Sequence, residues 1–141
     1  IPYRRLLEGD HDAVVDVVAA VVAASGTAHV KAILETGELP DQHMVRVAAD
    51  AAIAAGTDFI KTSTGKTPVS ATLDAASTML TAIAQAERSV GFKPSGGIRT
   101  VAEAVAYLDL ADEIMGHDWA TPDTFRFGAS SLLADVVSQL G

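Results

Sequence analysis

Three lysines, Lys31, Lys61 and Lys93, each interrupt an apolar run, and they are separated by 30 and 32 residues. A lysine in a buried strand is costly unless its charge is compensated or its basicity is lowered. Lowered basicity leaves part of the amine neutral, so that it can attack a carbonyl in Schiff-base chemistry. The regular spacing predicts three amines in register on neighbouring strands, which lie about 4.8 Å apart. The alternative is that each lysine pairs with a carboxylate such as Glu35 or Asp58, or extends to the surface.

Small residues and glycines follow the apolar runs of Lys61 and Lys93, and also a further apolar segment, 125–127. Glycine lets the backbone approach an anion closely, and the helix that follows contributes partial positive charge. A single such loop would be ordinary turn chemistry, whereas three together favour a phosphate site beside the amines. The three segments are Thr64-Gly65-Lys66, Ser95-Gly96-Gly97-Ile98-Arg99 and Gly128-Ala129-Ser130-Ser131.

The elements that must position these residues alternate between strands and helices. Such alternation predicts an α/β fold of parallel βα units in one domain, its sheet covered on both faces. Four units can form an open doubly wound sheet or half of an eight-stranded barrel. Residues 1–9 are expected to form a loop, and 113–115 is the alternative to 125–127 for the last strand. The expected strands are 28–35, 58–62, 90–93 and 125–127, and the expected helices are about 12–25, 41–55, 72–88, 100–110 and 130–140, the last closed by Gly141.

Composition narrows the function classes. The 141 residues are 49% hydrophobic and carry a net charge of −8, which argues against binding to nucleic acid or to anionic membranes. The absence of cysteine excludes disulfides and thiolate catalysis and fits a reducing cytoplasm. The four histidines show no metal-ligand spacing, so no metal site is expected. Ser130 and Ser131 have no histidine or aspartate at a recognised spacing, which makes a hydrolase improbable.

Several segments closely resemble the deoxyribose-phosphate aldolase family, class I aldolases built on a TIM barrel. The resemblance follows the order of the family over nearly the whole chain. It implies that residues 1–141 are a single, partial domain, the C-terminal half of a (β/α)8 barrel with about four parallel βα units. The matching segments are 30–39, 58–66, 91–99 and 126–131, together with the shorter 2–4 and 118–120.

The resemblance also implies an activity and its residues. Lys61 would form the Schiff base with C1 of open-chain 2-deoxy-D-ribose 5-phosphate, which is cleaved to glyceraldehyde 3-phosphate and acetaldehyde. Lys93 would lower the basicity of Lys61 and help to move protons. No metal or organic cofactor is implied. Substrate and phosphate contacts would come from Lys31, Thr64, Gly65, Lys66, Gly96, Gly97, Arg99, Gly128, Ser130 and Ser131.

The chain also departs from the family pattern. Family members are full barrels, and their relay aspartate lies on an earlier strand that this sequence lacks. The C-terminal tail that carries a tyrosine in some members is also missing. The start at Ile1 suggests the middle of a longer polypeptide. We therefore expect the N-terminal half-barrel to come from the same polypeptide or from another chain, within a homo-oligomer. The alternative is a catalytically silent half-barrel that binds phosphate and assembles with a partner chain.

Overall fold

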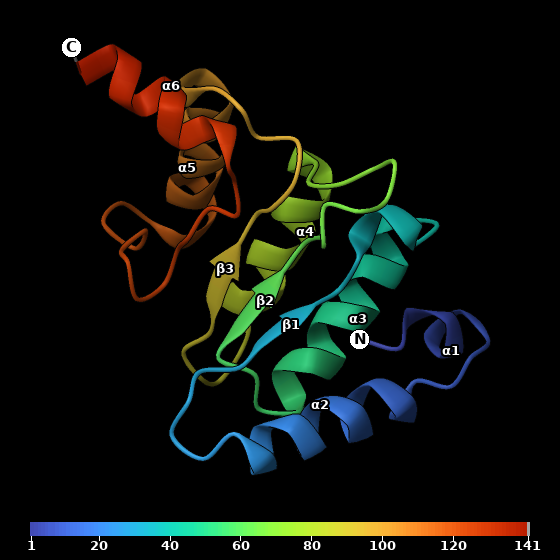
Figure 1. Ribbon diagram of the computed structural model, residues 1–141. Coiled ribbons are helices and arrows are strands. Elements are labelled where there is room, and N and C mark those ends of the chain that lie inside the picture. Colours follow the sequence, from blue (N-terminus) through green and yellow to red (C-terminus); the bar gives the residue numbers. More distant parts are fainter. Residues whose placement is uncertain (141) are drawn as a thin grey trace.

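Three short parallel strands organise the chain (Figure 1). The structure, a computed structural model, describes residues 1–140. The strands are β1 (Lys31–Ile33), β2 (Phe59–Lys61) and β3 (Gly91–Lys93), in the order β1-β2-β3. This α/β arrangement confirms the predicted alternation and is consistent with part of a TIM-type barrel. The helices are α1 (Tyr3–Leu7), α2 (Asp12–Ala24), α3 (Gln42–Ala54), α4 (Leu73–Ala84), α5 (Val101–Met115) and α6 (Ser131–Leu140), with a 3-10 turn, η1 (Thr36–Glu38), after β1.

The fourth predicted strand is present only as a bridged segment. Phe125 pairs with Phe92, and Gly128 pairs with Ser95, both in parallel orientation. Residues 113–115, the alternative, lie inside α5. The chain after α5 therefore runs beside β3 as expected, but it forms no regular strand within residues 1–140.

Hydroxyl and carboxylate caps start three of the helices. The side chain of Asp41 accepts a hydrogen bond from Met44 N at the start of α3, and Thr72 accepts one from Ala75 N at the start of α4. Thr100 and Glu103 form a capping box at the start of α5. These side chains satisfy backbone donors that have no partner inside the helix, which is why their positions predicted the helix starts correctly.

One expectation about the start of the chain was wrong. Residues 1–9 are not a plain loop, because α1 begins directly after Pro2 and buries Leu6. A helix this short leaves too little periodicity to be recognised. In α6, Leu132 is buried and Val136 packs partly against the core, while Leu133 and Leu140 are 69% and 82% exposed. The role expected for Gly141 lies outside the described residues.

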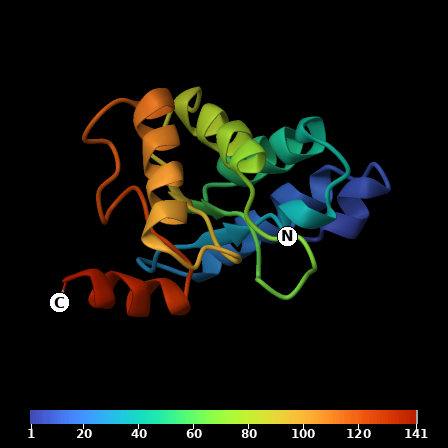
Figure 2. The ribbon, with the colours of Figure 1, turned by 90° about the horizontal axis from the view of Figure 1, so that it is seen from above.

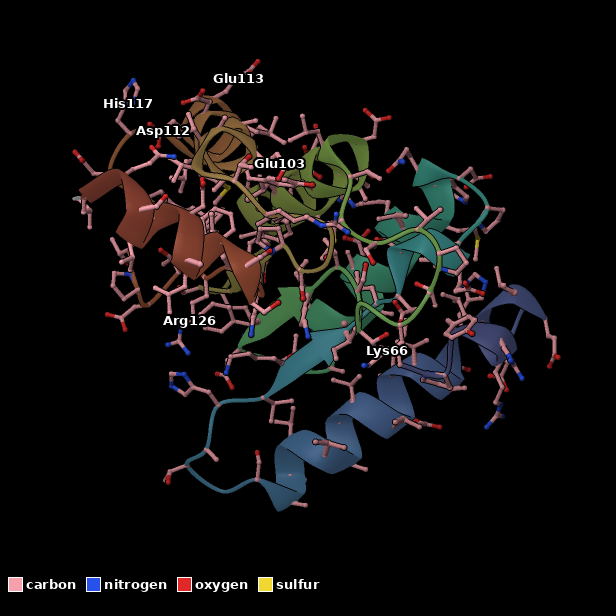
Figure 3. The ribbon with its side chains drawn as sticks, turned by 45° about the horizontal axis from the view of Figure 1, so that its top comes forward. Lys66, Glu103, Asp112, Glu113, His117 and Arg126 are labelled. Atoms are coloured by element: carbon pink, nitrogen blue, oxygen red, sulfur yellow. The ribbon has the colours of Figure 1, made fainter. Side chains whose placement is uncertain are left out.

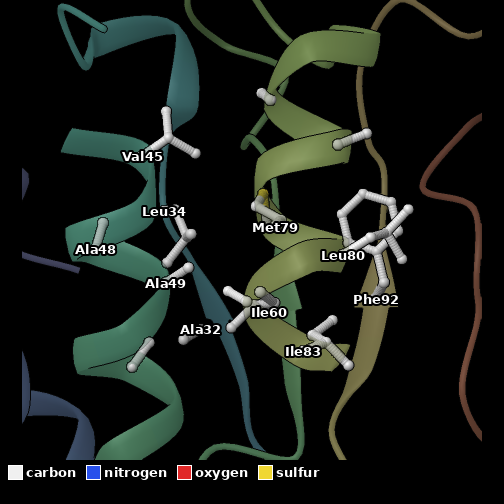
Figure 4. Close-up of a cluster of buried hydrophobic side chains, with 14 of the residues drawn as sticks. Ala32, Leu34, Val45, Ala48, Ala49, Ile60, Met79, Leu80, Ile83 and Phe92 are labelled. Atoms are coloured by element: carbon white, nitrogen blue, oxygen red, sulfur yellow. The ribbon is translucent and has the colours of Figure 1, made fainter. Parts of the chain in front are cut away.

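One face of the sheet is covered by helices and the other is not. Ala32, Ile60 and Phe92 alternate with the lysines and are buried against α3 and α4 (Figure 4). Seen from above, α3, α4 and α5 follow one side of the strands (Figure 2). The lysine face is only half-buried, so the expected burial on both faces is wrong for residues 1–140. None of the helices in this range is long and apolar enough to cross a lipid bilayer.

Gly91 and Phe59 pack against each other on the lysine face. The two residues are direct partners in the β2–β3 register, and Phe59 is 1% exposed although no helix covers this face. A Cβ atom on residue 91 would lie 2.3 Å from the Phe59 ring. Glycine is therefore required at residue 91 because the aromatic ring occupies the space that a side chain would need.

We predict that Gly91→Ala lowers the free energy of unfolding by about 1–3 kcal/mol, the usual cost of overpacking. Urea denaturation of the 141-residue chain measures it. Phe59→Leu vacates part of the space, so the same glycine substitution should cost less in that background. Equal costs in both backgrounds would contradict the steric explanation.

Candidate active site

The register between β2 and β3 places two of the lysines side by side. Lys61 and Lys93 are direct partners in the parallel ladder, so their side chains leave the same face of the sheet. Lys31 pairs with Phe59 instead, while Ile33 is the partner of Lys61. All three lysines share one face, but the prediction that all three lie in register was wrong, because Lys31 sits two residues earlier on its strand.

Burial and nearby cations affect the amine of Lys93. Burial is the main cause that lowers the pKa of Lys93, and the positive charges of Lys61, Lys31 and Arg126 lower it further. A lysine in this setting is neutral more often than a solvated one. Lys93 is therefore suited to accept and return a proton.

Carboxylates do not neutralise this group of cations. The ion pairs within residues 1–140 are Arg5 with Asp10, Arg46 with Asp50 and His117 with Asp112, and none includes a lysine. The two carboxylates considered as partners bind elsewhere. Asp58 accepts a hydrogen bond from Val30 N at 2.7 Å, and Glu35 accepts one from Thr64 N at 3.1 Å. Pairing of the lysines with Glu35 or Asp58 is therefore wrong.

Two of the cations lie against the same aromatic ring. Lys31 Nζ lies 5.4 Å from the centroid of the Phe59 ring, and Arg126 Cζ lies 4.9 Å from it. The negative π face attracts each cation, which partly compensates for their mutual repulsion.

In Figure 3, Arg126 and Lys66 lie toward different edges of the sheet, whereas Glu103, Asp112 and Glu113 lie away from the strands on α5.

The predicted loops meet in one cleft of about 450 Å³ at the carboxyl ends of β2 and β3. Lys61 reaches this cleft from the sheet. The structure therefore brings together nine of the twelve residues predicted from the sequence, contributed by three separate segments. The cleft is lined by Lys61, Thr64, Gly65, Ser95, Gly96, Gly97, Ile98, Arg99, Gly128, Ala129, Ser130 and Ser131.

Several backbone donors in this cleft are available to a ligand. Within residues 1–140, the N–H groups of Gly65, Gly97 and Ser130 donate to no protein acceptor. Gly65 and Gly97 have φ values of 78° and 87°, which glycine adopts without strain. With Arg99 on the same wall, these donors form a surface suited to an anion.

Three predicted residues do not line the cleft. Lys93 lies next to the cleft, since a Cβ atom on Gly128, which lines it, would be 3.2 Å from Lys93 Cε. Lys66 belongs to the loop after β2 and is exposed. Lys31 lines a separate, mostly apolar cavity of about 410 Å³ between α2 and β1, together with Glu35 and Thr64. The expected role of Lys31 in the same pocket is therefore not supported by its position.

Two residues that support the cleft were not among the site residues predicted from the sequence. The hydroxyl of Thr62 donates to Ser95 O at 3.1 Å and accepts from Ser95 N at 2.9 Å, tying together the ends of β2 and β3. Ser95 in turn donates through its hydroxyl to Gly128 O at 3.2 Å. The one available signal was a pair of small hydroxyl residues at strand ends, which is common in turns. No group of three His, Cys, Asp or Glu side chains in the described part of the chain is placed to hold a metal ion.

Comparison with known proteins gives consistent matches. The model of a family described as DeoC/LacD family aldolase matches residues 1–137. The chain is 55% identical over 141 residues to a deoxyribose-phosphate aldolase of Agrobacterium fabrum, covering 99% of this chain and 54% of that protein. The chain thus spans about half the length of this relative.

Solved structures share the fold. A Toxoplasma gondii ME49 protein assigned as a deoxyribose-phosphate aldolase, in its apo form, superposes with a TM-score of 0.91 at 27% identity over 98% of this chain and 56% of its own. The tetrameric deoxyribose phosphate aldolase of Aeropyrum pernix superposes with a TM-score of 0.68 at 28% identity over 93% of this chain and 50% of its own.

We predict that Arg126→Gln raises the pKa of Lys93 toward its ordinary value, because it removes one of the positive charges that disfavour the protonated amine. The rise should be partial, since burial is the larger cause. A pH titration followed by the 13C shift of Lys93 Cε measures it. Arg99→Gln is the matched control and should leave the pKa of Lys93 in place; an equal response to both changes would contradict the assignment to Arg126.

Proposed function

The chain belongs to the DeoC/LacD family of aldolases, and from that premise we propose that it supplies the Schiff-base lysine and the phosphate-binding loops of a deoxyribose-phosphate aldolase. The observation that carries the proposal is the position of Lys61, which lines the cleft of glycine loops and is also the direct neighbour of Lys93. An amine and an anion site are what a phosphorylated aldehyde requires.

In the proposed reaction, the Lys61 amine attacks C1 of open-chain 2-deoxy-D-ribose 5-phosphate, and water leaves to give an iminium ion. A base removes the proton of the C3 hydroxyl, and the C2–C3 bond breaks. Its electron pair moves onto the iminium, which becomes an enamine as glyceraldehyde 3-phosphate departs. Protonation of the enamine at C2 and hydrolysis release acetaldehyde and regenerate the lysine.

Lys93 is the proposed partner in proton transfer. It lies beside Lys61 in the register, and burial lowers its pKa, so its amine gives up a proton more readily than a solvated lysine does. The proposed mechanism involves no metal or organic cofactor.

The anionic end of the substrate would bind at the glycine loops. The unpartnered N–H groups of Gly65, Gly97 and Ser130 and the cation of Arg99 face the same cleft as Lys61. Gly96, Gly128 and Ser131 complete that wall, and Lys66 would reach it from its exposed loop. Thr64 lines the same cleft as Lys61 and would contact the sugar.

We further propose that residues 1–141 form a single partial domain corresponding to the C-terminal half of a barrel. The half-open lysine face and the exposed apolar residues of α2 and α6 support this. The missing half would be contributed by the same polypeptide or by another chain, within a homo-oligomer. The absence of cysteine suits a reducing cytoplasm.

A catalytically silent half-barrel is the second candidate. It would keep the phosphate-binding wall and assemble with a partner chain without turning over substrate. The uncovered lysine face favours it, because no helix within residues 1–140 closes this face over the amines.

Borohydride trapping with acetaldehyde distinguishes the two candidates. We expect an adduct on Lys61, located by peptide mapping against the other three lysines. Lys61→Arg keeps the charge and removes the nucleophile, so it should abolish the adduct. An adduct that survives this change would exclude the proposed role of Lys61. Cleavage of 2-deoxyribose 5-phosphate after addition of the N-terminal half would then distinguish the enzyme from the silent half-barrel.

The uncovered faces predict association. We expect the 141-residue chain, with a monomer mass of 14.5 kDa, to elute at a larger mass in gel filtration with light scattering. Val137→Lys, on the exposed face of α6, should reduce that mass if this face takes part. A well-folded, soluble monomer at all concentrations would contradict the need for a cover.

A further inference from the structure

Glu35 is a buried carboxylate in an unfavourable backbone conformation. It follows β1, is 7% exposed and has φ 57° and ψ 55°, in the left-handed region that glycine adopts most easily. Burying a carboxylate also costs free energy unless donors surround it. Two costs thus fall on one residue at the edge of the site, although it lies outside the cleft.

The side chain of Glu35 binds the loop after β2. Thr64 N donates to both carboxylate oxygens, at 3.1 and 3.3 Å. The hydroxyl of Thr67 lies 3.3 Å from one of those oxygens and 2.8 Å from Val69 O, so its single proton is shared between them. The carboxylate therefore spans residues 64 and 67, on either side of Gly65 and Lys66.

The neighbouring backbone supports the same loop. A Cβ atom on Gly37, in η1, would lie 2.1 Å from Val69 O, so the turn after Glu35 packs directly against the far part of the loop. On the other side, a Cβ atom on Gly96 would lie 3.3 Å from Gly65 Cα. The loop is held between η1 and the glycine segment after β3, and Glu35 provides the hydrogen bonds on the η1 side.

We propose that Glu35 is a positioning residue, whose buried carboxylate holds the loop after β2 so that Gly65 and Lys66 stay in place to bind the phosphate group. The inference rests on the proposed function for the identity of the anion. A glycine at residue 35 would remove the backbone strain but could not hold Thr64. The contact between the Glu35 side chain and Thr64 thus accounts for a non-glycine residue in this strained backbone conformation.

The sign of the effect separates positioning from simple electrostatics. Glu35 is negative, so its removal near an anion site should strengthen phosphate binding by charge alone. If Glu35 positions the loop, its removal should weaken binding. Glu38→Gln is the matched control, because it removes the same charge from η1, three residues away, and its side chain makes no hydrogen bond to the loop within residues 1–140.

The test uses Glu35→Ala, Glu35→Gln and Glu38→Gln in the 141-residue chain. Hydrogen exchange reports on the Thr64 amide, and inorganic phosphate is titrated against the amide resonances of Gly65 and Gly97. For Glu35→Ala we expect exchange at Thr64 to be faster and phosphate affinity to be lower, each by about tenfold. Trapping of acetaldehyde on Lys61 should change by a smaller factor, because acetaldehyde has no phosphate. Glu35→Gln keeps one acceptor oxygen and the side-chain volume, so its effects should be intermediate, and it decides the question if the alanine variant does not fold.

Tighter phosphate binding in both Glu35 variants, or unchanged exchange at Thr64, would overturn the positioning role. Equal losses in exchange protection, phosphate binding and trapping would also overturn it, because they indicate general destabilisation. If the unmodified chain binds no phosphate and traps no acetaldehyde, the proposed function fails. Hydrogen exchange at Thr64 then still decides whether Glu35 holds the loop.

Discussion

The parallel pairing of β2 with β3 is the constraint on which the site depends. Side chains on a strand alternate between faces, so a shift of one residue would send Lys61 and Lys93 to opposite sides. The register is fixed by burial on the other face, where Ile60 and Phe92 are fully enclosed beneath the helices. Apolar packing that makes no contact with a ligand therefore sets the separation of the two amines.

The ends of these strands are as important as their middles. Thr62 and Ser95 exchange hydrogen bonds where β2 and β3 finish, and Ser95 reaches Gly128 in the bridged segment. These contacts satisfy buried polar groups, and beyond them the N–H groups of Gly65, Gly97 and Ser130 have no protein acceptor within residues 1–140. The anion-binding donors of the cleft are therefore available because regular strand pairing ends here. If the strands continued, these N–H groups would bond to neighbouring strands.

Much of this could be predicted from the sequence where the signal is local. Asp41, Thr72 and Thr100 revealed helix starts because a capping side chain acts within three residues. The position of Lys31 could not be predicted from spacing alone, since loop lengths do not fix the register between strands. The contact between Glu35 and Thr64 joins residues that are 29 positions apart in the sequence. It could not be predicted, because a single carboxylate in the sequence does not indicate which distant donor it will bind.

The distribution of charge has a consequence for kinetics. The chain carries 18 acidic and 10 basic residues, so its average field repels anions. Six of the ten basic residues nevertheless lie on the lysine face or the loops around the cleft: Lys31, Lys61, Lys66, Lys93, Arg99 and Arg126. The local field of this cluster of cations attracts a small anion toward the cleft during its diffusive approach, although the net charge repels it. The rate at which an anion meets the cleft then depends on the position of these cations more than on the net charge of the chain. Salt screens their field and therefore slows the arrival of the anion.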